Sequence, residues 1–361
     1  MLAIGLMSGT SLDGIDAALI ETDGERQVRA IAFRGEAYSD AARTQLAAAT
    51  AMALTFERPR ASPDLVAAGE LIDRTHALAV HKLLREAGVE AREVAVIGYH
   101  GQTVAHRPDR GWTWQIGDGA VLARATGITV VSDLRSADVA AGGQGAPLLP
   151  VYHAALAVAL QPPVAVLNLG GVGNITFVGR DGDVIAFDTG PANGLIDSWI
   201  EAESGARFDT DGALAAAGQL NTAVLTAMLD HPFFDCPPPK SLDRNDFTIQ
   251  RARGLSAADG AATLTAFTAA TVAEAIDRLP ERPTRLIVAG GGRRNPTMLR
   301  MIAERTGLSP ESSDSLGWNG DAMEAEGFAY MAVRTLKGLP ISFPGTTGVP
   351  AAMPGGVIHR A

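Results

Sequence analysis

Three glycine-rich segments of this chain carry groups that can hold an anion. They read SGTSLDGID at 8–16, GGVGN at 170–174 and GGGRRN at 290–295. Glycine lets the backbone approach a ligand without a Cβ in the way, and successive backbone N–H groups then form a concave donor site. The first segment adds serine and threonine hydroxyls and two carboxylates. These residue types predict phosphate binding.

Two such loops and a glycine-rich junction before a helix would suit the phosphates and the adenosine of ATP. Asp13 and Asp16 in the first loop are carboxylates that could hold Mg²⁺ through water. A single loop of this kind is also compatible with an ordinary hairpin turn, because glycine and serine favour turns. The recurrence of the loop, with Asp-Thr-Gly at 188–190 close behind the second copy, favours the nucleotide interpretation.

The predicted nucleotide site has neither of two common phosphate-binding motifs. A Walker A loop needs Gly-Lys-Ser/Thr, but Lys82, Lys240 and Lys337 follow histidine, proline and leucine. The dinucleotide fingerprint Gly-x-Gly-x-x-Gly fails at its third glycine, where the candidate at 171–176 ends in threonine. The site is therefore of neither P-loop nor Rossmann type.

The elements that would position these loops alternate between strands and helices. Residues 2–7 and 15–21 read as two strands of a hairpin with the first loop between them. The same strand–loop–strand pattern recurs at 164–179. We therefore expect a duplicated α/β architecture whose halves face each other across a cleft. The glycine-rich segment 137–150, which closes with proline, is the expected hinge or crossing between them.

Other elements follow from the same patterns. Apolar residues at helical spacing over 64–87 predict one or two helices closed by Gly88. The run VAVIGYHG at 94–101 predicts a strand with a polar tip. Asn295 and Pro296 are expected to open a helix after the third glycine-rich segment.

Composition excludes several classes of function. The chain has 361 residues and a net charge of −10, which argues against a nucleic-acid binder whose affinity rests on clustered basic residues. Its one cysteine leaves no internal disulfide and no cysteine-based metal site. The N-terminus lacks the basic segment of a signal peptide, and Pro162-Pro163 interrupts the most apolar stretch before it could span a bilayer. We expect a cytoplasmic protein that binds neither nucleic acid nor membrane.

Several motifs, in order along the chain, carry a resemblance to a known family. They are GLMSGTSLDGIDAAL at 5–19, GYHGQTVAHRP at 98–108, WQIGDG at 114–119, DLRSADVAAGGQGAPLLP at 133–150, NLGGVGNIT at 168–176, DTGPANGLID at 188–197 and GGGRRNP at 290–296. Together they resemble the anhydro-N-acetylmuramic acid kinases of the sugar kinase, Hsp70 and actin superfamily. The resemblance runs from Leu2 to about Pro344. It departs at 237–247, where PPPKSLDRNDF stands in place of the family's Lys-Ser-Thr-Gly-Arg.

The resemblance implies a fold and a reaction. The fold is a two-lobed, ribonuclease H-like duplicated α/β ATPase with an interdomain cleft. Residues 1–136, with about 340–361, would form the lobe of the first phosphate loop, and 137–339 the lobe of the second loop, the catalytic aspartate and the adenosine site. In the reaction, ATP, water and 1,6-anhydro-N-acetylmuramic acid give N-acetylmuramic acid 6-phosphate and ADP. Its implied setting is peptidoglycan recycling and amino-sugar catabolism, with ATP and Mg²⁺ as cofactors.

Breaking the anhydro bridge asks for a carboxylate that activates water against the anomeric carbon. Asp188 is the candidate catalytic residue, because it ends an apolar strand, VIAFD, beside the second loop. The alternative is that Asp188 caps a helix beginning near Ala192.

The other site residues lie in the matching motifs. Arg135 is the expected partner of the sugar's carboxylate, with a surface arginine as the alternative. Glu326 is a substrate-side acid by resemblance, or an exposed helical glutamate. His100 is either a ligand contact or a buried, hydrogen-bonded histidine. The substrate-binding candidates are His100, Gln102, Thr103, Arg135 and Glu326, and Asp13 is the metal candidate, acting through water. The ATP-binding candidates are Gly9, Thr10, Ser11, Leu12, Asp13, Gly14, Ile15, Asp16, Gly170, Gly171, Gly173, Asn174, Gly290, Gly291, Gly292 and Asn295.

Two other functions are compatible with such a fold. One is an actin- or Hsp70-like ATP-driven binding protein, although no separate peptide-binding module follows the motifs within the 361 residues. The other is a kinase for a different sugar or carboxylate, since function depends on the site and not on the scaffold. The sequence leaves open whether the chain forms a homodimer.

Overall fold

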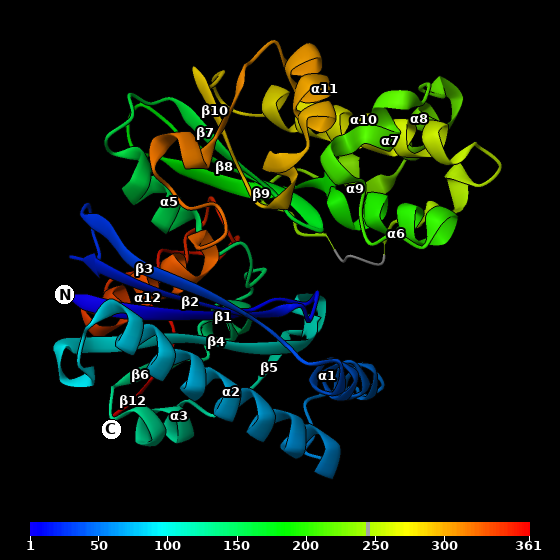
Figure 1. Cartoon of the computed structure of the whole chain (residues 1–361). Helices are drawn as coiled ribbons and strands as arrows, with labels where there is room; N and C mark the ends of the chain where they lie inside the picture. The colour runs from blue at the N-terminus through cyan, green and yellow to red at the C-terminus, as the bar shows by residue number, and fades with distance from the viewer. Residues whose placement is uncertain (243–245) are drawn as a thin grey trace. The chain divides into compact units, whose positions relative to one another are not determined.

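The computed structural model describes residues 1–242 and 246–361. It divides into two compact units, and each is described by itself (Figure 1). Unit 1 comprises Met1–Leu156 and Ala322–Ala361, and unit 2 comprises Ala157–Asp321.

Unit 1 is built on a seven-stranded sheet in the order β12-β6-β4-β1-β2-β3, with β5 also paired to β4. The strands are β1 (Leu2–Ser8), β2 (Gly14–Thr22), β3 (Val28–Ala37), β4 (Val94–Arg107), β5 (Trp112–Ile116), β6 (Val130–Ser132) and β12 (Val357–His359). The helices are α1 (Asp40–Ala53), α2 (Pro63–Ala87), α3 (Gly119–Thr126), α4 (Ser136–Ala140), α5 (Pro150–Ala157, ending at the unit boundary) and α12 (Met323–Leu336). The expected first hairpin is present as β1 and β2. The helix expected over 64–87 is present as α2, closed by Gly88 in the left-handed conformation.

Helix α12 packs directly against the strands of this sheet. A Cβ added to Gly5 of β1 would lie 1.7 Å from the Ala325 carbonyl oxygen, and one on Gly98 of β4 would lie 2.0 Å from that of Phe328. The next residue of β4, Tyr99, points to the other face and donates a hydrogen bond to Asp73 of α2 at 2.8 Å. The sheet therefore lies between α12 and α2, and glycine at two positions allows the closer of these contacts (Figure 1).

We predict that Gly98→Ala destabilises the protein by about 3 kcal/mol or more, because the new methyl group overlaps a backbone carbonyl that can move only with the helix. Urea-induced unfolding measures this loss. The matched control is Gly69→Ala within α2, where the nearest atom to an added Cβ is 3.8 Å away. For Gly69→Ala we expect the free energy of unfolding to increase by up to about 1 kcal/mol, because alanine has a higher helix propensity than glycine. Equal effects at the two positions would contradict this packing.

Unit 2 contains a five-stranded sheet in the order β11-β10-β7-β8-β9. The strands are β7 (Val164–Leu169), β8 (Val172–Val178), β9 (Val184–Pro191), β10 (Arg285–Ala289) and β11 (Pro310–Ser312). The helices are α6 (Asn193–Ser204), α7 (Ala213–Ala217), α8 (Thr222–Leu229), α9 (Pro232–Asp235), α10 (Ala257–Asp277) and α11 (Pro296–Thr306). Most of α10 is buried, and its Leu264, Phe267 and Val272 belong to the core of this unit.

The two sheets share one topology. In unit 1, β3-β2-β1 are antiparallel neighbours, and β4 and β6 continue the sheet in parallel. In unit 2, β9-β8-β7 repeat the antiparallel part, and β10 and β11 repeat the parallel part. The repeat of the hairpin pattern thus reflects a duplicated strand order.

The compact units do not break where the sequence placed the lobe boundaries. The expected boundaries were 136/137 and 339/340, whereas the units meet at 156/157 and 321/322. Segment 137–156 stays in unit 1, where Asp138 accepts hydrogen bonds from the Gly145 amide at 2.6 Å and the Thr347 hydroxyl at 2.5 Å. Helix α12 stays there too, because it covers the sheet of unit 1.

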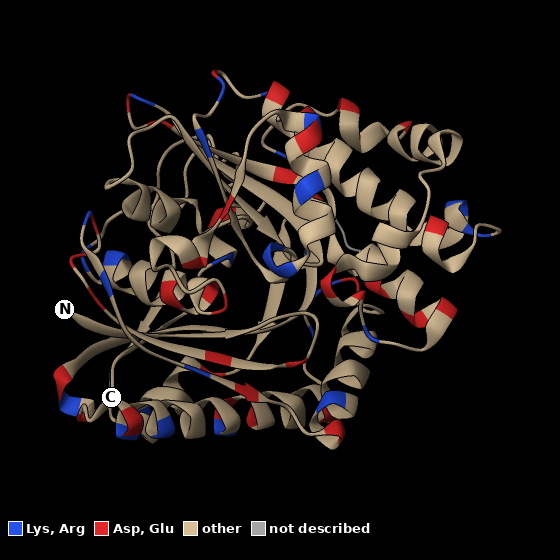
Figure 2. Ribbon diagram, turned by 45° about the horizontal axis from the view of Figure 1, so that its top comes forward, with Lys and Arg blue, Asp and Glu red and all other residues tan. Residues whose placement is uncertain are grey.

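Acidic and basic residues are interspersed along α2 (Figure 2). Within residues 1–242 and 246–361, no single helix is both long and apolar enough to cross a membrane. One pair, Thr210–Ala217 with Thr222–Leu229, meets the length and composition criteria together but is bent by 117°.

Candidate functional site

The first glycine-rich loop joins β1 to β2 and is anchored at its base. The Ser8 hydroxyl donates to Gln102 Oε1 at 2.6 Å and lies 2.9 Å from the Tyr38 hydroxyl. The Gln102 amide nitrogen donates to the Gly9 carbonyl at 3.2 Å. Gln102, one of the expected substrate contacts, is fully buried and holds the base of this loop.

The tip of this loop is exposed and carries polar groups. Leu12 has φ of 56°, an uncommon conformation for a residue with a Cβ, and its amide donates to the Gly9 carbonyl to close the turn. The Ser11 hydroxyl donates to Asp13 Oδ1 at 2.9 Å. Of the other predicted phosphate-loop residues, Thr10 is exposed at the tip, and Gly14, Ile15 and Asp16 begin β2.

Asp13 is the one predicted metal contact. The described residues include no cluster of three or more His, Cys, Asp or Glu side chains that could hold a metal ion. Mg²⁺ is commonly held by one or two carboxylates together with substrate phosphates and water. A single exposed aspartate at the predicted phosphate loop fits that mode of binding.

The second glycine-rich loop joins β7 to β8 and rests on the start of α6. The carbonyl of Gly170 accepts from the Asn193 amide at 2.9 Å, and that of Gly171 accepts from Ala192 and Gly194 at 3.1 Å. A Cβ on Gly171 would meet no atom within 4 Å, whereas one on Gly173 would lie 2.7 Å from the Thr189 hydroxyl. Gly171 is therefore the position of this loop that is open to a ligand.

Asp188 lies opposite Asn174 across strands β8 and β9. It does not end its strand as expected, because β9 continues to Pro191 past an irregularity in the pairing at Gly173 and Asn174. It does not cap α6 either, since the Leu242 amide donates to its Oδ2 at 2.7 Å. Burial raises the pKa of Asp188 to about 7, against the Leu242 hydrogen bond and the charge of Lys240, which lower it. A carboxylate with such a pKa can accept a proton near neutral pH.

The third glycine-rich segment follows β10. Gly290 has φ of +72°, and a Cβ there would lie 2.4 Å from Asn168 Oδ1, so only glycine fits. Asn295 caps α11 by accepting from the Met298 amide at 2.9 Å, which confirms the expected helix start. Gly291 is exposed and lies near the Asn193 side chain beside the second loop.

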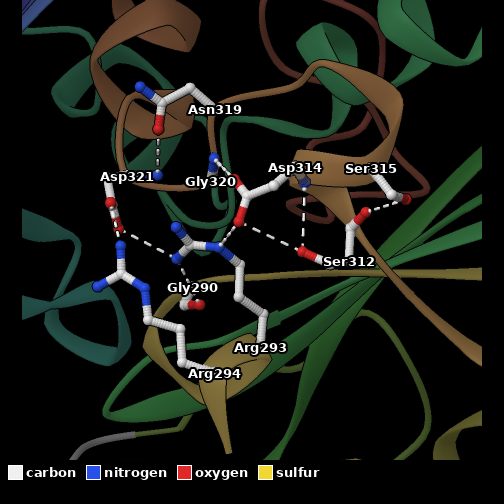
Figure 3. Close-up of polar contacts among 9 residues, drawn as sticks. All are labelled: Gly290, Arg293, Arg294, Ser312, Asp314, Ser315, Asn319, Gly320 and Asp321. Carbon is white, nitrogen blue, oxygen red and sulfur yellow. Dashed lines mark hydrogen bonds and ion pairs between the residues drawn. The ribbon is translucent and has the colours of Figure 1, made fainter.

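Arg293 connects the third glycine-rich segment to Asp314 and Asp321, which precede α12 in the sequence. Its Nε donates to Asp314 at 2.8 Å, and its Nη1 donates to Asp321 and to the Gly290 carbonyl, both at 3.0 Å (Figure 3). Its side chain is 2% exposed, whereas Arg294 beside it is 64% exposed and pairs with Asp321 alone. Arg293 was not among the residues selected from the sequence.

We predict that Arg293→Met lowers the free energy of unfolding by about 2 kcal/mol, because the ion pairs of the buried guanidinium with Asp314 and Asp321 are lost, and the Gly290 carbonyl loses a donor. The control, Arg294→Met, removes an exposed ion pair and should cost less than about 1 kcal/mol. Chemical denaturation of both variants tests the difference. Similar losses would mean that burial of Arg293 adds nothing to its ion pairs.

A pocket of about 290 Å³ lies in unit 1 beside β4. Strand β4 pairs with β6 at residues 97–98 and with β5 at residues 102–107, and the pocket lies along the residues between these two stretches. Its volume is at the lower end of the range for small-molecule sites. Polar and aromatic groups line it, among them His100, Trp114, Gln115, Asp133 and Ser136. Thr103, a predicted contact residue, lies behind this lining, where its hydroxyl accepts from the Gln115 amide at 3.1 Å.

His100, which lines this pocket, forms a hydrogen-bonded pair with Arg135. Arg135 Nε donates to His100 Nε2 at 3.1 Å, and Arg135 Nη1 donates to the Gly145 carbonyl at 2.8 Å. Burial and the neighbouring guanidinium hold the pKa of His100 well below its usual value, so the imidazole is neutral. Burial also lowers the pKa of Arg135 to about 10, which leaves it charged at neutral pH.

Helix α12 brings a glutamate to this pair, but not the one predicted. Glu326 is 4% exposed and accepts from the Tyr152 hydroxyl at 2.6 Å, inside unit 1. Glu324, which the sequence analysis did not select, interacts electrostatically with Arg135 and with Asp13. Burial raises its pKa, and the charge of Arg135 opposes that rise. Glu324 is therefore a second candidate acid, near Arg135, and the substrate role of Glu326 stays a prediction.

The segment that departs from the family pattern is described only in part. Lys240 and Leu242 contact the Asp188 region, while Arg244 lies outside the described residues.

Two sheets of one topology, each with a glycine-rich loop after its first strand, define the duplicated α/β fold of the actin-like sugar kinases. The crystal structure of (R)-2-hydroxyglutaryl-CoA dehydratase component A from Acidaminococcus fermentans is similar in fold, with a TM-score of 0.51 and 14% identity over 93% of this chain and 99% of that one. A family model described as anhydro-N-acetylmuramic acid kinase matches residues 1–361. The chain belongs to this family.

Two curated relatives carry the same name. The anhydro-N-acetylmuramic acid kinase of Rhizorhabdus wittichii is 68% identical, covering 100% of this chain and 99% of the relative. That of Zymomonas mobilis is 53% identical, covering 99% of this chain and 100% of the relative. The similarity therefore spans both units.

Proposed function

We propose that this protein is an ATP-dependent kinase that opens 1,6-anhydro-N-acetylmuramic acid by hydrolysis and phosphorylates its O6. The products are N-acetylmuramic acid 6-phosphate and ADP. The oxygen of water bonds to C1 as the C1–O6 bond breaks, and O6 takes the γ-phosphoryl group from ATP, which leaves as ADP. The proton lost by water passes to a carboxylate of the enzyme.

The observation that carries this proposal is the setting of Asp188. This half-buried carboxylate stands beside the second glycine-rich loop, and burial raises its pKa to about 7. Ordinary sugar kinases deprotonate a hydroxyl, but here O6 has no proton until the bridge is cut. We therefore assign Asp188 as the base that deprotonates water.

The pocket of unit 1 is the proposed sugar site. Arg135 remains charged and is held in place by Gly145 and His100, so it suits the carboxylate of the substrate. Gln115 and Ser136 offer hydrogen bonds to hydroxyl or N-acetyl groups, and Trp114 offers an apolar face. Glu324 could accept a hydrogen bond from a hydroxyl group of the sugar.

The glycine-rich loops are the proposed nucleotide site. The loops at 9–16 and 170–174 would hold the phosphates, and Gly290, Gly291 and Gly292 with Asn295 the adenosine. Mg²⁺, held by Asp13 through water, would neutralise charge on the phosphates. We place the enzyme in the cytoplasm, in the recycling of peptidoglycan sugars.

A coupled assay of ADP release tests the function. Rapid release with the anhydro sugar, and none above background with glucose or acetate, supports the proposal. Release independent of any sugar would instead favour an ATP-driven binding protein, and release with another acceptor would favour a different kinase.

The pH dependence of kcat/KM gives a further prediction. Asp188 acts as a base only when deprotonated, and its pKa is about 7. We expect kcat/KM to fall about tenfold per pH unit below that value and to level off above it. A profile measured with the anhydro sugar that stays flat between about pH 5.5 and 8 would contradict this role.

A further inference from the structure

The segment that departs from the family pattern is fastened to the strand that carries Asp188. The Asp188 amide donates to the Lys240 carbonyl at 2.9 Å, and the Leu242 amide donates back to Asp188 Oδ2 at 2.7 Å. Each of these two hydrogen bonds joins residues that are more than 50 positions apart in the sequence.

Lys240 is the anchor of this segment. Its residue is 9% exposed, its Nζ donates to the Phe233 carbonyl at 2.8 Å, and the same ammonium lies 4.3 Å from the centre of the Phe233 ring. A buried ammonium held in this way ties the segment to α9. The contacts of Lys240 therefore hold the neighbouring Leu242 amide in position to donate to Asp188.

We propose that the backbone N–H of Leu242 is a positioning group for the reaction. It occupies Oδ2 of Asp188 and leaves Oδ1 as the oxygen that receives the proton of water. This rests on the proposed function, in which Asp188 is the base. A backbone N–H can donate this hydrogen bond whichever side chain the residue carries. This explains why leucine is tolerated at a position where the family has threonine.

The hydrogen bond also affects the pH range in which Asp188 is deprotonated and can act as a base. A donor to a carboxylate favours its charged form, so the Leu242 N–H lowers the pKa of a group that burial raises. The charged group that acts on Asp188 with it is Lys240, while Asn174, opposite on β8, is neutral. Loss of the N–H would therefore raise the pKa of Asp188 further.

The test replaces the N–H and keeps the side chain. Leu242 is exchanged for its α-hydroxy acid, leucic acid, which turns the amide into an ester, and Leu242→Pro removes the same donor by standard mutagenesis. Leu242→Ala is the matched control, because it changes the side chain and retains the N–H. Both donor-deleting variants should move the acidic limb of the kcat/KM profile upward by about one pH unit, while Leu242→Ala stays within about 0.3 unit of the original.

A second readout separates this inference from the function itself. Infrared titration of ¹³C-labelled aspartate, with Asp188→Asn identifying the signal, measures the carboxyl pKa without substrate. An upward shift in the ester variant supports the hydrogen bond even if the anhydro sugar is not the substrate. An unshifted carboxyl pKa in a folded ester variant, or a shift of equal size in Leu242→Ala, would overturn the proposal.

Discussion

Asp188→Asn is expected to reduce turnover by on the order of 10²–10⁴ or more while ATP and sugar still bind. The amide has the shape of the carboxylate, and its oxygen can still accept from the Leu242 N–H. Its NH₂ group then stands where the base oxygen was and cannot take a proton from water. Steady-state ADP release and calorimetric binding measure the two halves of this expectation.

The control for this variant lies in the same unit. Asp183→Asn changes an exposed aspartate in the turn before β9, and its turnover should stay within about twofold of the original. Comparable losses in both variants would mean that charge in this region, and not proton transfer at Asp188, limits the reaction.

Isotope labelling examines the same step in the unmodified enzyme. In ¹⁸O-water, the label should enter C1 of N-acetylmuramic acid 6-phosphate, because water attacks that carbon as O6 leaves. Label in the phosphate group would show that water attacks phosphorus. The role of Asp188 would then be wrong, even if its substitution abolished activity.

Gly171→Val should weaken ATP binding by on the order of 100-fold or more, a loss of about 2.7 kcal/mol. The residue is exposed, and an added Cβ meets no atom of the chain within 4 Å. The branched side chain therefore fits the fold but occupies the space through which a phosphate would approach the loop amides. Titration calorimetry with ATP measures the loss.

Two further measurements make this prediction specific. The melting temperature of Gly171→Val should match that of the original protein, because nothing in the fold is displaced. Gly171→Ala, with a smaller side chain, should give a weaker effect in the same direction. Unchanged nucleotide affinity in Gly171→Val would remove the second loop from the nucleotide site.

Local sequence determined the elements and the loops that carry chemistry. The hairpin of β1 and β2, the closure of α2 at Gly88 and the start of α11 at Asn295 depend on neighbouring residues, so their patterns could be read directly. The three glycine-rich loops follow from the same short-range information. The resemblance supplied the reaction that needs a base, and the apolar run VIAFD beside the second loop made Asp188 the predicted one.

Tertiary structure decided which side chains reach those loops. Glu324 and Glu326 are two residues apart on α12, and residues so spaced point in different directions on a helix. Only the packing of α12 on Gly5 and Gly98 places Glu326 against Tyr152 and Glu324 near Arg135. The same packing assigns α12 to unit 1. The partner of Asp188 is likewise a backbone amide at residue 242, which no side-chain pattern reveals because every residue except proline carries one.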